Sequence, residues 1–516
     1  MESTAARQLD KRLCAKARHA RDARFDGLFF VGVKTTGIFC RPICPATPPK
    51  EQNVEYFTSA LHAAQAGLRP CLRCRPESAP GSPAWRGVQT TLSRAIALID
   101  AGEWQSGSLP AFAERLGVSD RYLRRLFRQH LGVSPVKYAN YQRAMFARQL
   151  LQQTALPISE VAYRAGFGST RRFNDVFMAL TGLNPRQLRR AEQQEQSNPR
   201  SLSVLLSYRP PYDWAALRDF YYTRQIAGME RLTADSYSRT CHFGDGAGLF
   251  TATHLAAKHA FRVELELDKA ELTLPVIQRI RRLLDLDADV ATIAADLGSH
   301  PLLGQLHRPG LRLPGIWSPF EAGVRAILGQ QVSVKAAHRL VTRLVEELGE
   351  SLGVGSASGA DSDLPHLLFP TPAAVLASDL DFLAMPGRRK QALWALAGYL
   401  ERGETGHLER GETSNVCGSD SPASAQTEFD HWLALPGIGP WTVQYAAFRM
   451  GNPNIFLAGD LGVKNALKKL AADDSALETI ASDQLSPWGS YATLLLWQSL
   501  SDGGSEAARK QSKPLR

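Results

Sequence analysis

The sequence has few cysteines and no long apolar run. Seven cysteines in 516 residues are too few for a disulfide framework, and no uncharged apolar stretch reaches the roughly 18 residues that cross a membrane. The sequence also lacks the charged start and apolar segment of a signal peptide. We therefore expect a soluble, cytoplasmic protein without a membrane partner, in which clustered cysteines more often bind metal than form disulfides.

The positive charge is concentrated near the N-terminus. A chain of 516 residues is too long for one hydrophobic core and favours three or four domains. Residues 1–85 contain 13 Lys and Arg against 7 Asp and Glu, and residues 86–192 contain 16 against 7. With a net charge of +10 for the whole chain, residues 193–516 carry −5. The basic part indicates a polyanion partner.

Polar segments without apolar periodicity divide the chain. Their Gly, Ser and charged residues cannot bury a core, so we expect linkers and mobile insertions there. Between them the patterns are mostly helical, but "HAFRVELEL" (259–267) alternates like a strand and predicts a small mixed sheet-and-helix unit. The expected linkers and insertions lie at 77–85, 191–201, near 350–364 and at 402–428.

Four cysteines form two close pairs. Cys40 and Cys44 are separated by three residues, and Cys71 and Cys74 by two, with 26 residues between the pairs. Two closely spaced cysteine pairs, each able to supply two metal ligands and joined by a loop, are typical of a tetrahedral zinc site. The alternative is four unrelated buried thiols. The other three cysteines have no such partners and are interpreted as ordinary: Cys14, Cys241 and Cys417.

The surroundings of Cys40 suggest that its sulfur reacts. A zinc ion held by four thiolates carries a formal charge of −2, which keeps a sulfur unprotonated and nucleophilic at neutral pH. Arg41 follows Cys40 directly and Lys34 is close by, and both are able to hold a phosphate beside the metal. A purely structural zinc site is the alternative.

Two helix-turn-helix patterns follow the cysteine region. Residues 109–135 and 157–185 each read as a helix, a Gly-containing turn and a second helix rich in arginine. Such second helices enter the major groove of DNA, where arginine reaches phosphates or guanine edges. The alternative is a helical bundle with a solvated basic face. The candidate DNA-binding residues are Arg121, Arg124, Arg125, Arg128, Arg171 and Arg172.

The densest motif lies near the C-terminus. "LPGIGPWT" reads as a helix, a Gly-x-Gly hairpin and a second helix, in which Gly437 and Gly439 allow a phosphate to approach backbone amides. Asp460 follows the hairpin by some twenty residues. The alternative for Asp460 is a helix cap, and both roles are compatible.

The N-terminal motifs resemble known families. "FFVGVKTTGIFCRPICP…NVEYF…AAQAGLRPCLRCRPE" is similar to the zinc domain of Ada-type regulators, which accepts methyl groups from DNA methylphosphotriesters. The resemblance implies that Cys40 is the methyl acceptor and that zinc (Zn2+) is bound by Cys40, Cys44, Cys71 and Cys74. The helix-turn-helix pair resembles the AraC-type DNA-binding domain, which implies double-stranded DNA and RNA polymerase as partners.

The C-terminal motifs resemble the helix-hairpin-helix DNA glycosylase superfamily, and the flanking sequence resembles its AlkA type, 3-methyladenine DNA glycosylase II. The resemblance implies that Asp460 is catalytic and that Gln330 and Gln331 lie where the family inserts a side chain into DNA. Trp441 stands where bifunctional relatives have a lysine, so we expect base removal without strand cleavage. The sequence has no four-cysteine cluster downstream of this motif, which excludes the relatives that carry an iron–sulfur cluster. The base pocket implied by the family comprises Phe220, Trp441, Tyr445 and Trp497, whereas packing is expected for Trp432 and Trp488.

The expected fold is multidomain and mainly α. It comprises a small zinc-bound α+β domain, a double helix-turn-helix domain, a small α+β domain with an antiparallel sheet and an all-α glycosylase domain. The implied function is excision of N-alkylated bases combined with transcriptional activation triggered by methylation of Cys40. The alternative is a regulator whose glycosylase half binds DNA without catalysis. No Pro-Cys-His-Arg acceptor for alkylguanine occurs. The expected domain bounds are 1–80, 86–192, 203–285 and 286–505.

Overall fold

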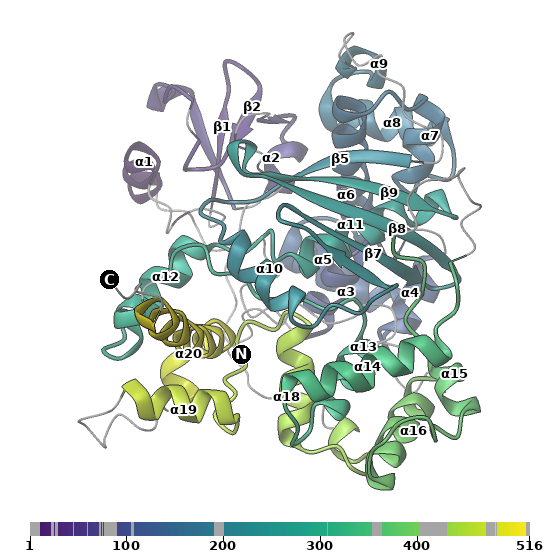
Figure 1. The fold of residues 1–516 in the computed structure, drawn as a ribbon. Helices are drawn as coiled ribbons and strands as arrows, with labels where there is room; N and C mark the ends of the chain where they lie inside the picture. Colours follow the sequence, from purple (N-terminus) through teal and green to yellow (C-terminus); the bar gives the residue numbers. More distant parts are fainter. Residues whose placement is uncertain are drawn as a thin grey trace. The chain divides into compact units, whose positions relative to one another are not determined.

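The chain folds into two compact units, the first made mainly of residues up to Val204 and the second mainly of residues from Leu205 onward (Figure 1). The expected insertion at 402–428, most of the one near 350–364 and the expected linker at 77–85 lie outside the described residues. This computed structural model describes residues 11–511 except 22–24, 26–28, 45, 59, 72–73, 75, 77–89, 105–107, 190–200, 307, 353–363, 402–430, 471–479 and 481.

A small four-stranded sheet in the first unit brings the two cysteine pairs together. Its strand order is β3-β1-β2-β4, and β2 pairs in parallel with β4, with Phe39 opposite Pro70. Cys40 ends β2 and Cys71 directly follows β4, so the register carries both to the same end of the sheet. The elements are α1 (Lys11–Ala20), β1 (Phe30–Val33), β2 (Ile38–Cys40), β3 (Val54–Phe57), α2 (Ala60–Gln65) and β4 (Arg69–Pro70).

The rest of the first unit is helical and contains both predicted helix-turn-helix motifs. The second helix of each begins at a serine N-cap, Ser119 or Ser169, and ends at a glycine with positive φ, Gly132 or Gly182. These local signals confirm the predicted helices. The elements are α3 (Thr90–Asp100), α4 (Leu109–Arg115), α5 (Asp120–Leu131), α6 (Pro135–Gln153), α7 (Ile158–Arg164), α8 (Thr170–Thr181) and α9 (Pro185–Leu188).

The second unit begins with a five-stranded sheet of order β5-β9-β8-β7-β6, visible in Figure 1. The strand expected at 259–267 is β9, and residues of β8 alternate between buried and partly exposed, as strands with one buried face do. The elements are β5 (Ser201–Ser207), α10 (Trp214–Tyr222), β6 (Glu230–Leu232), β7 (Ser236–Phe243), β8 (Gly246–Leu255) and β9 (Ala260–Leu267). The next helix is α11 (Thr273–Leu283), of which the residues up to Gln278 are grouped with the first unit.

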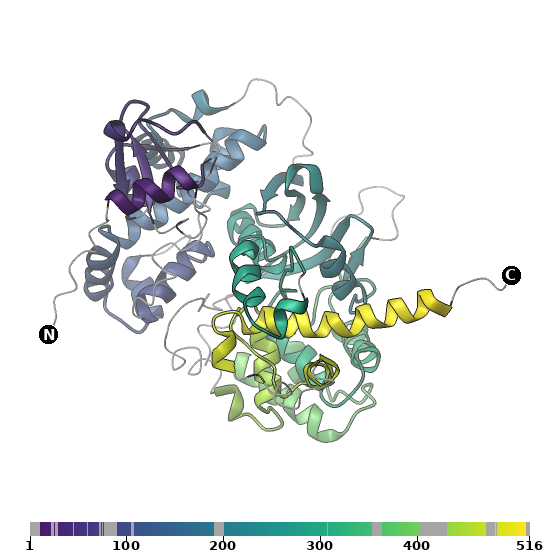
Figure 2. The same ribbon diagram turned by 90° about the vertical axis from the view of Figure 1, so that its left-hand side faces the viewer.

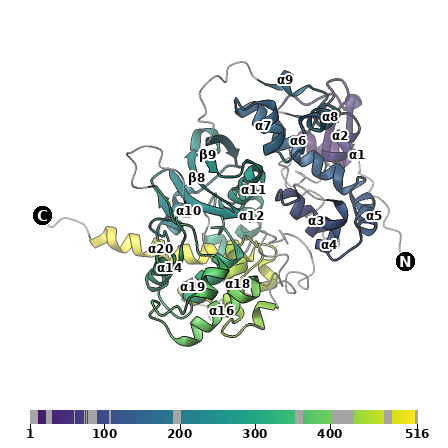
Figure 3. The same ribbon diagram turned by 90° about the vertical axis from the view of Figure 1, so that its right-hand side faces the viewer.

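Helices complete the second unit, ending in α20 (yellow in Figure 2). The helical pattern of residues 320–348 is interrupted by a short loop between α13 and α14. Trp432 and Trp488 are buried, as expected for packing residues. Helices α14, α16 and α18 each pack against α13, whereas α19 packs against α20. Figure 3 shows α14, α16 and α18 on the side of this unit away from the sheet strands β8 and β9. The elements are α12 (Val290–Gly298), α13 (Pro319–Leu328), α14 (Val334–Leu348), α15 (Pro372–Ala377), α16 (Gly387–Glu401), α18 (Pro440–Arg449), α19 (Leu461–Leu470) and α20 (Gly489–Gln511).

Candidate functional sites

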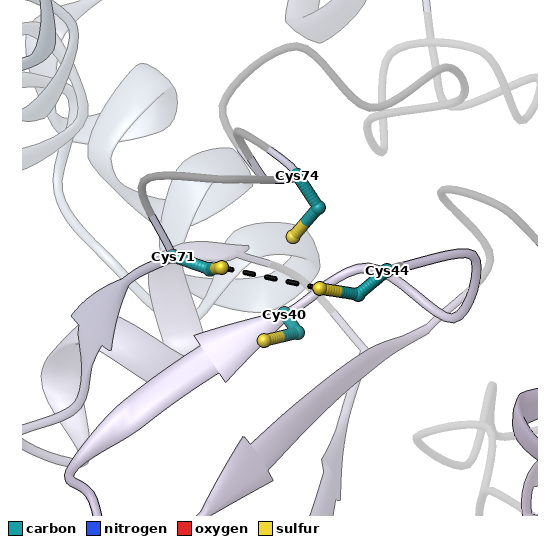
Figure 4. A group of neighbouring side chains, drawn as sticks. All are labelled: Cys40, Cys44, Cys71 and Cys74. Carbon is teal, nitrogen blue, oxygen red and sulfur yellow. Dashed lines mark hydrogen bonds between the residues drawn. The ribbon is translucent and has the colours of Figure 1, made fainter. Parts of the chain in front are cut away.

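The four predicted cysteines form one cluster. Their sulfur atoms all lie within 4.8 Å of one another, and the sulfurs of Cys44 and Cys71 are 4.0 Å apart (Figure 4). Four Zn–S bonds of about 2.3 Å in a tetrahedron place the sulfurs about 3.8 Å apart, so this donor set fits zinc. The cluster is a zinc site, which confirms the cofactor prediction.

Hydrogen bonds among the thiols separate their pKa values. The contact with Cys44 is the largest cause that raises the pKa of Cys40, whereas the contact with Cys40 is the largest cause that lowers the pKa of Cys44 to about 7. At this spacing each thiol therefore changes the pKa of its neighbours. A divalent cation competes with those protons and, when bound, keeps the thiols deprotonated at neutral pH.

Cys40 is half-buried and lines a cavity of about 390 Å³ together with Thr36, Arg41 and Lys50. The Arg41 side chain, which the sequence suggested as a phosphate ligand, is 7% exposed, and its guanidinium donates to the carbonyl of Cys74 at 3.3 Å. Arg41 therefore supports the cysteine loop from inside the domain, while Lys50 is exposed.

The second helix of each helix-turn-helix motif exposes arginines on the side opposite its buried face. In α5, Arg121, Arg125 and Arg128 are exposed, and Arg124 is half-buried and pairs with Asp120 at 3.4 Å. In α8, the first turn carries the exposed residues Arg171 and Arg172. The arrangement presents two basic helix faces, as major-groove readers require.

Asp460 is held at the start of α19 by four donors. Its Oδ1 accepts the backbone N–H groups of Gly462 (2.8 Å) and Val463 (3.2 Å) and the indole N–H of Trp497 (2.9 Å). Its Oδ2 accepts the indole N–H of Trp441 at 3.2 Å. The capping role of Asp460 is thus confirmed, and Oδ2 is the oxygen with more acceptor capacity left for a ligand.

Two of the four predicted pocket aromatics donate to this carboxylate, and a third packs against one of them. Trp441 stacks on Tyr445 with ring centroids 5.2 Å apart and an interplanar angle of 19°. Trp497 meets Phe448 edge to face at 5.3 Å. Residues from α18 and α20, about fifty positions apart in sequence, therefore converge on Asp460.

The fourth aromatic, Phe220 of α10, reaches the same region through two arginines. The guanidinium of Arg224 lies 3.8 Å from the Phe220 ring centroid and that of Arg449 lies 5.0 Å from it. Arg449 also donates to the Tyr445 hydroxyl at 3.2 Å. A ring face covered at 3.8 Å is not open to another cation, so Phe220 offers less free π-surface than the sequence suggested.

The same arginines change the titration of Tyr445. Burial raises the pKa of its hydroxyl, but the charges of Arg449 and Arg224 outweigh burial, and the pKa is lowered overall. The side of the aromatic cluster near Phe220 is therefore electropositive, whereas the side near Asp460 carries the carboxylate.

The two hairpin glycines have different roles. Gly437 has φ +80°, and a Cβ there would lie 2.9 Å from the Cβ of Ala392, so only glycine fits. Gly439 is the N-cap of α18 at an ordinary φ of −105°, and a Cβ there would meet nothing within 4 Å. The open space in front of Gly439 leaves the first amides of α18 accessible to a phosphate.

Comparisons with known proteins match most of the chain. Family models described as the metal binding domain of Ada, a helix-turn-helix domain and the AlkA N-terminal domain match residues 13–77, 112–191 and 203–318. A probable bifunctional transcriptional activator/DNA repair enzyme AlkA of Mycobacterium tuberculosis is 37% identical over 496 residues, covering 94% of this chain and 96% of that protein.

The chain belongs to this family of bifunctional activator and repair proteins. Two further relatives match its separate parts. DNA-3-methyladenine glycosylase 2 of Escherichia coli is 31% identical over 297 residues, covering 57% of this chain and 95% of that protein. The bifunctional transcriptional activator/DNA repair enzyme AdaA of Bacillus subtilis is 32% identical over 178 residues, covering 34% of this chain and 81% of that protein.

The sequence interpretation did not include Arg224 and Arg449, whose guanidinium groups pack against the predicted pocket residue Phe220. Each follows a predicted pocket aromatic by four positions, Phe220 in one case and Tyr445 in the other. A spacing of four places two side chains on the same helix face, so this signal was available in the sequence. The interpretation also did not mention the exposed apolar side chain next to the carboxylate: Leu461 follows Asp460 and is 71% exposed.

Among the described residues, no helix is both long and apolar enough to span a bilayer.

In the second unit, four buried charged side chains connect the five-stranded sheet to α13. Glu321 accepts from Arg239 (2.9 Å) and Arg325 (2.9 Å), and Glu230 pairs with the same two arginines at 3.4 and 3.1 Å. Glu321 is 1% exposed. Arg325 also donates to the carbonyl of Arg224 at 3.0 Å, so the network supports the chain next to Phe220.

Substitution Glu321→Gln is expected to lower the free energy of unfolding by about 3 kcal/mol, because it leaves buried guanidinium charge uncompensated. Burial raises the pKa of Glu321, but Arg239 and Arg325 more than offset it, so the pKa is lowered. The charge therefore stabilises the fold above the unfolded-state pKa of about 4.3, and this contribution is lost as the pH falls through the folded-state value. Urea unfolding at pH 7 and at pH 3.5 measures both effects.

The matched control is Glu346→Gln. Glu346 pairs with Arg343 at 4.0 Å on α14, and both side chains are about half exposed. Its loss should change the free energy of unfolding by less than about 0.5 kcal/mol. Equal losses for the two variants would contradict the structural role of the buried network.

Proposed function

We propose that this protein excises N-alkylated bases such as 3-methyladenine from double-stranded DNA by hydrolysis, and that it activates transcription after Cys40 has accepted a methyl group from a DNA methylphosphotriester. The observation that carries the first part is the Asp460 carboxylate, held by two indoles and two backbone amides at the edge of an aromatic cluster. We also propose that the four domains have the bounds expected from the sequence, 1–80, 86–192, 203–285 and 286–505.

Base excision follows from the chemistry of these groups. An N-alkylated purine is cationic and its glycosidic bond is already weak, so the leaving base needs little protonation. The stacked rings of Trp441 and Tyr445 attract a flipped cationic base. The Asp460 carboxylate stabilises the positive charge that develops on the sugar, and it can orient the attacking water. Gly437 and Gly439 would hold the DNA backbone through the first amides of α18.

Methyl transfer follows from the cysteine cluster. The Cys40 sulfur attacks the methyl carbon of the phosphotriester, an S–C bond forms, the C–O bond breaks and the phosphodiester leaves as an anion. Zinc, when bound, keeps the sulfur anionic. Alkylation changes the formal charge of the site from −2 to −1, which reduces its repulsion of phosphate and raises DNA affinity. Together with the six predicted arginines of the helix-turn-helix motifs, this couples damage to promoter binding and to RNA polymerase.

The test is base release from a methylated duplex by the purified wild-type chain. We expect free methylated purine and an intact strand that breaks only on treatment with alkali, because Trp441 provides no amine for a Schiff base with the sugar. The released base is measured by chromatography and strand breaks on denaturing gels. Absence of released base would favour a regulator that binds DNA without catalysis, and spontaneous strand breaks would contradict the monofunctional mechanism.

A further inference from the structure

Two neighbouring glutamines in the loop between α13 and α14 are placed in opposite ways. Gln331 is exposed and adopts a φ of +53°, in the left-handed region. Gln330 is half-buried and turned inward: its Nε2 donates to the carbonyl oxygen of Gly437 at 3.0 Å and to the hydroxyl of Thr442 at 2.8 Å. Both acceptors belong to the hairpin region, more than 100 residues further along the chain.

The acceptors of Gln330 are themselves firmly placed. Gly437 packs against Ala392, which leaves no room for even a Cβ, and Thr442 is 2% exposed within α18. A glutamine amide has two N–H donors, and these two bonds use both. Gln330 therefore has no amide donor left for DNA, although the sequence interpretation grouped it with Gln331.

The conformation of Gln331 needs such support. A non-glycine residue in the left-handed region costs of order 1 kcal/mol and persists only where the surroundings hold it. The loop is held on one side by the two Gln330 bonds, and a Cβ on Gly329 would lie 3.9 Å from the ring of Trp441. The loop, the hairpin and the predicted base pocket are thus in contact.

We propose that Gln330 is a positioning residue that locks the loop of Gln331 to the hairpin, so that phosphate capture by the hairpin and insertion of Gln331 into the duplex occur as one rigid movement. This inference rests on the proposed base excision. A loop that is ordered before binding avoids the cost of fixing it during base flipping, and it keeps the wedge in register with the Trp441 ring.

The decisive variant is Gln330→Glu, which preserves the shape, removes both donors and places an oxygen against the Gly437 carbonyl. On a duplex with one 7-methylguanine we expect kcat to fall about ten- to a hundredfold with little change in KM, because the loop is misplaced rather than lost. Thr442→Val, which removes the accepting hydroxyl, should reproduce part of the fall in kcat. Thr442→Ser, which keeps the hydroxyl, should retain the wild-type kcat. The matched control is Gln305→Glu, an exposed glutamine whose Nε2 donates to the carbonyl of Pro301 at 3.3 Å, away from the hairpin.

Two further readouts do not depend on base release. Amide hydrogen exchange of residues 329–333 and 437–439 should accelerate together, by about tenfold or more, in Gln330→Glu and not in Gln305→Glu. In the second readout, the fluorescence of 2-aminopurine beside an abasic-site analogue reports unstacking of the duplex. The double variant Gln330→Glu with Gln331→Ala should lose no more of this unstacking than the more damaging of the two single variants.

Unchanged exchange in the hairpin, or additive effects of the two substitutions, would overturn the inference even if wild type excises bases normally. If wild type releases no base, the proposed excision fails separately. The exchange and fluorescence measurements then still decide whether Gln330 couples the loop to the hairpin.

Discussion

The variant Asp460→Asn is expected to lose base release by at least about 1,000-fold relative to wild type, a loss of about 4 kcal/mol of transition-state stabilisation. The reason is the removal of the negative charge beside the sugar, because the fold around it should survive. Asparagine caps helices about as well as aspartate, so the bonds from Gly462 and Val463 can persist. Single-turnover release of methylated purine from a duplex measures the effect.

The same variant should keep its affinity for DNA. The amide nitrogen of asparagine cannot accept the Trp441 indole N–H now bonded to Oδ2, so a modest loss of stability is expected as well. The matched control is Asp296→Asn, since Asp296 accepts the indole N–H of Trp488 at 2.7 Å outside the aromatic cluster. Asp296→Asn should release bases at the wild-type rate. Comparable loss in the two variants would show that indole–carboxylate contacts matter only for folding.

Much of this architecture was predictable because its signals are local. The helices of both helix-turn-helix motifs begin at serine or follow proline, and the second helices end at Gly132 and Gly182, so their ends are encoded within a few residues. The cysteine spacing predicted the cluster. The resemblance to helix-hairpin-helix glycosylases implied a functional carboxylate at Asp460, and the helix cap that was named as its alternative is present as well.

What the sequence could not indicate are contacts between distant side chains. The bonds from Gln330 to the hairpin span more than 100 residues, and the pairing of Arg239 with Glu321 spans 82. Such partners have no periodicity or spacing, since they depend on how helices pack. For the same reason the sequence did not indicate that Arg41, which it suggested as a phosphate ligand, donates to the carbonyl of Cys74.

The variant Cys40→Ser is expected to accept no methyl group and yet to bind DNA as if it were already methylated. Three thiolates around zinc carry a formal charge of −1, which is also the charge after methylation of the four-thiolate site. One charge fewer beside a phosphate is worth about 1 to 4 kcal/mol, so affinity for an undamaged duplex should rise about tenfold at low salt and less at high salt. Methyl transfer is followed by mass spectrometry of the protein after incubation with methylated DNA.

The informative comparison is Cys44→Ser, which lowers the formal charge by the same amount but retains the Cys40 sulfur. It should bind the undamaged duplex as tightly as Cys40→Ser while still gaining the mass of one methylene group, located on Cys40 by peptide mapping. A misfolded domain would instead lose zinc and DNA binding in both variants. Transfer that persists in Cys40→Ser would show that another sulfur is the acceptor. Affinity that stays at the unmethylated level in both variants would show that charge is not the switch, since the two substitutions share only their effect on the charge of the site.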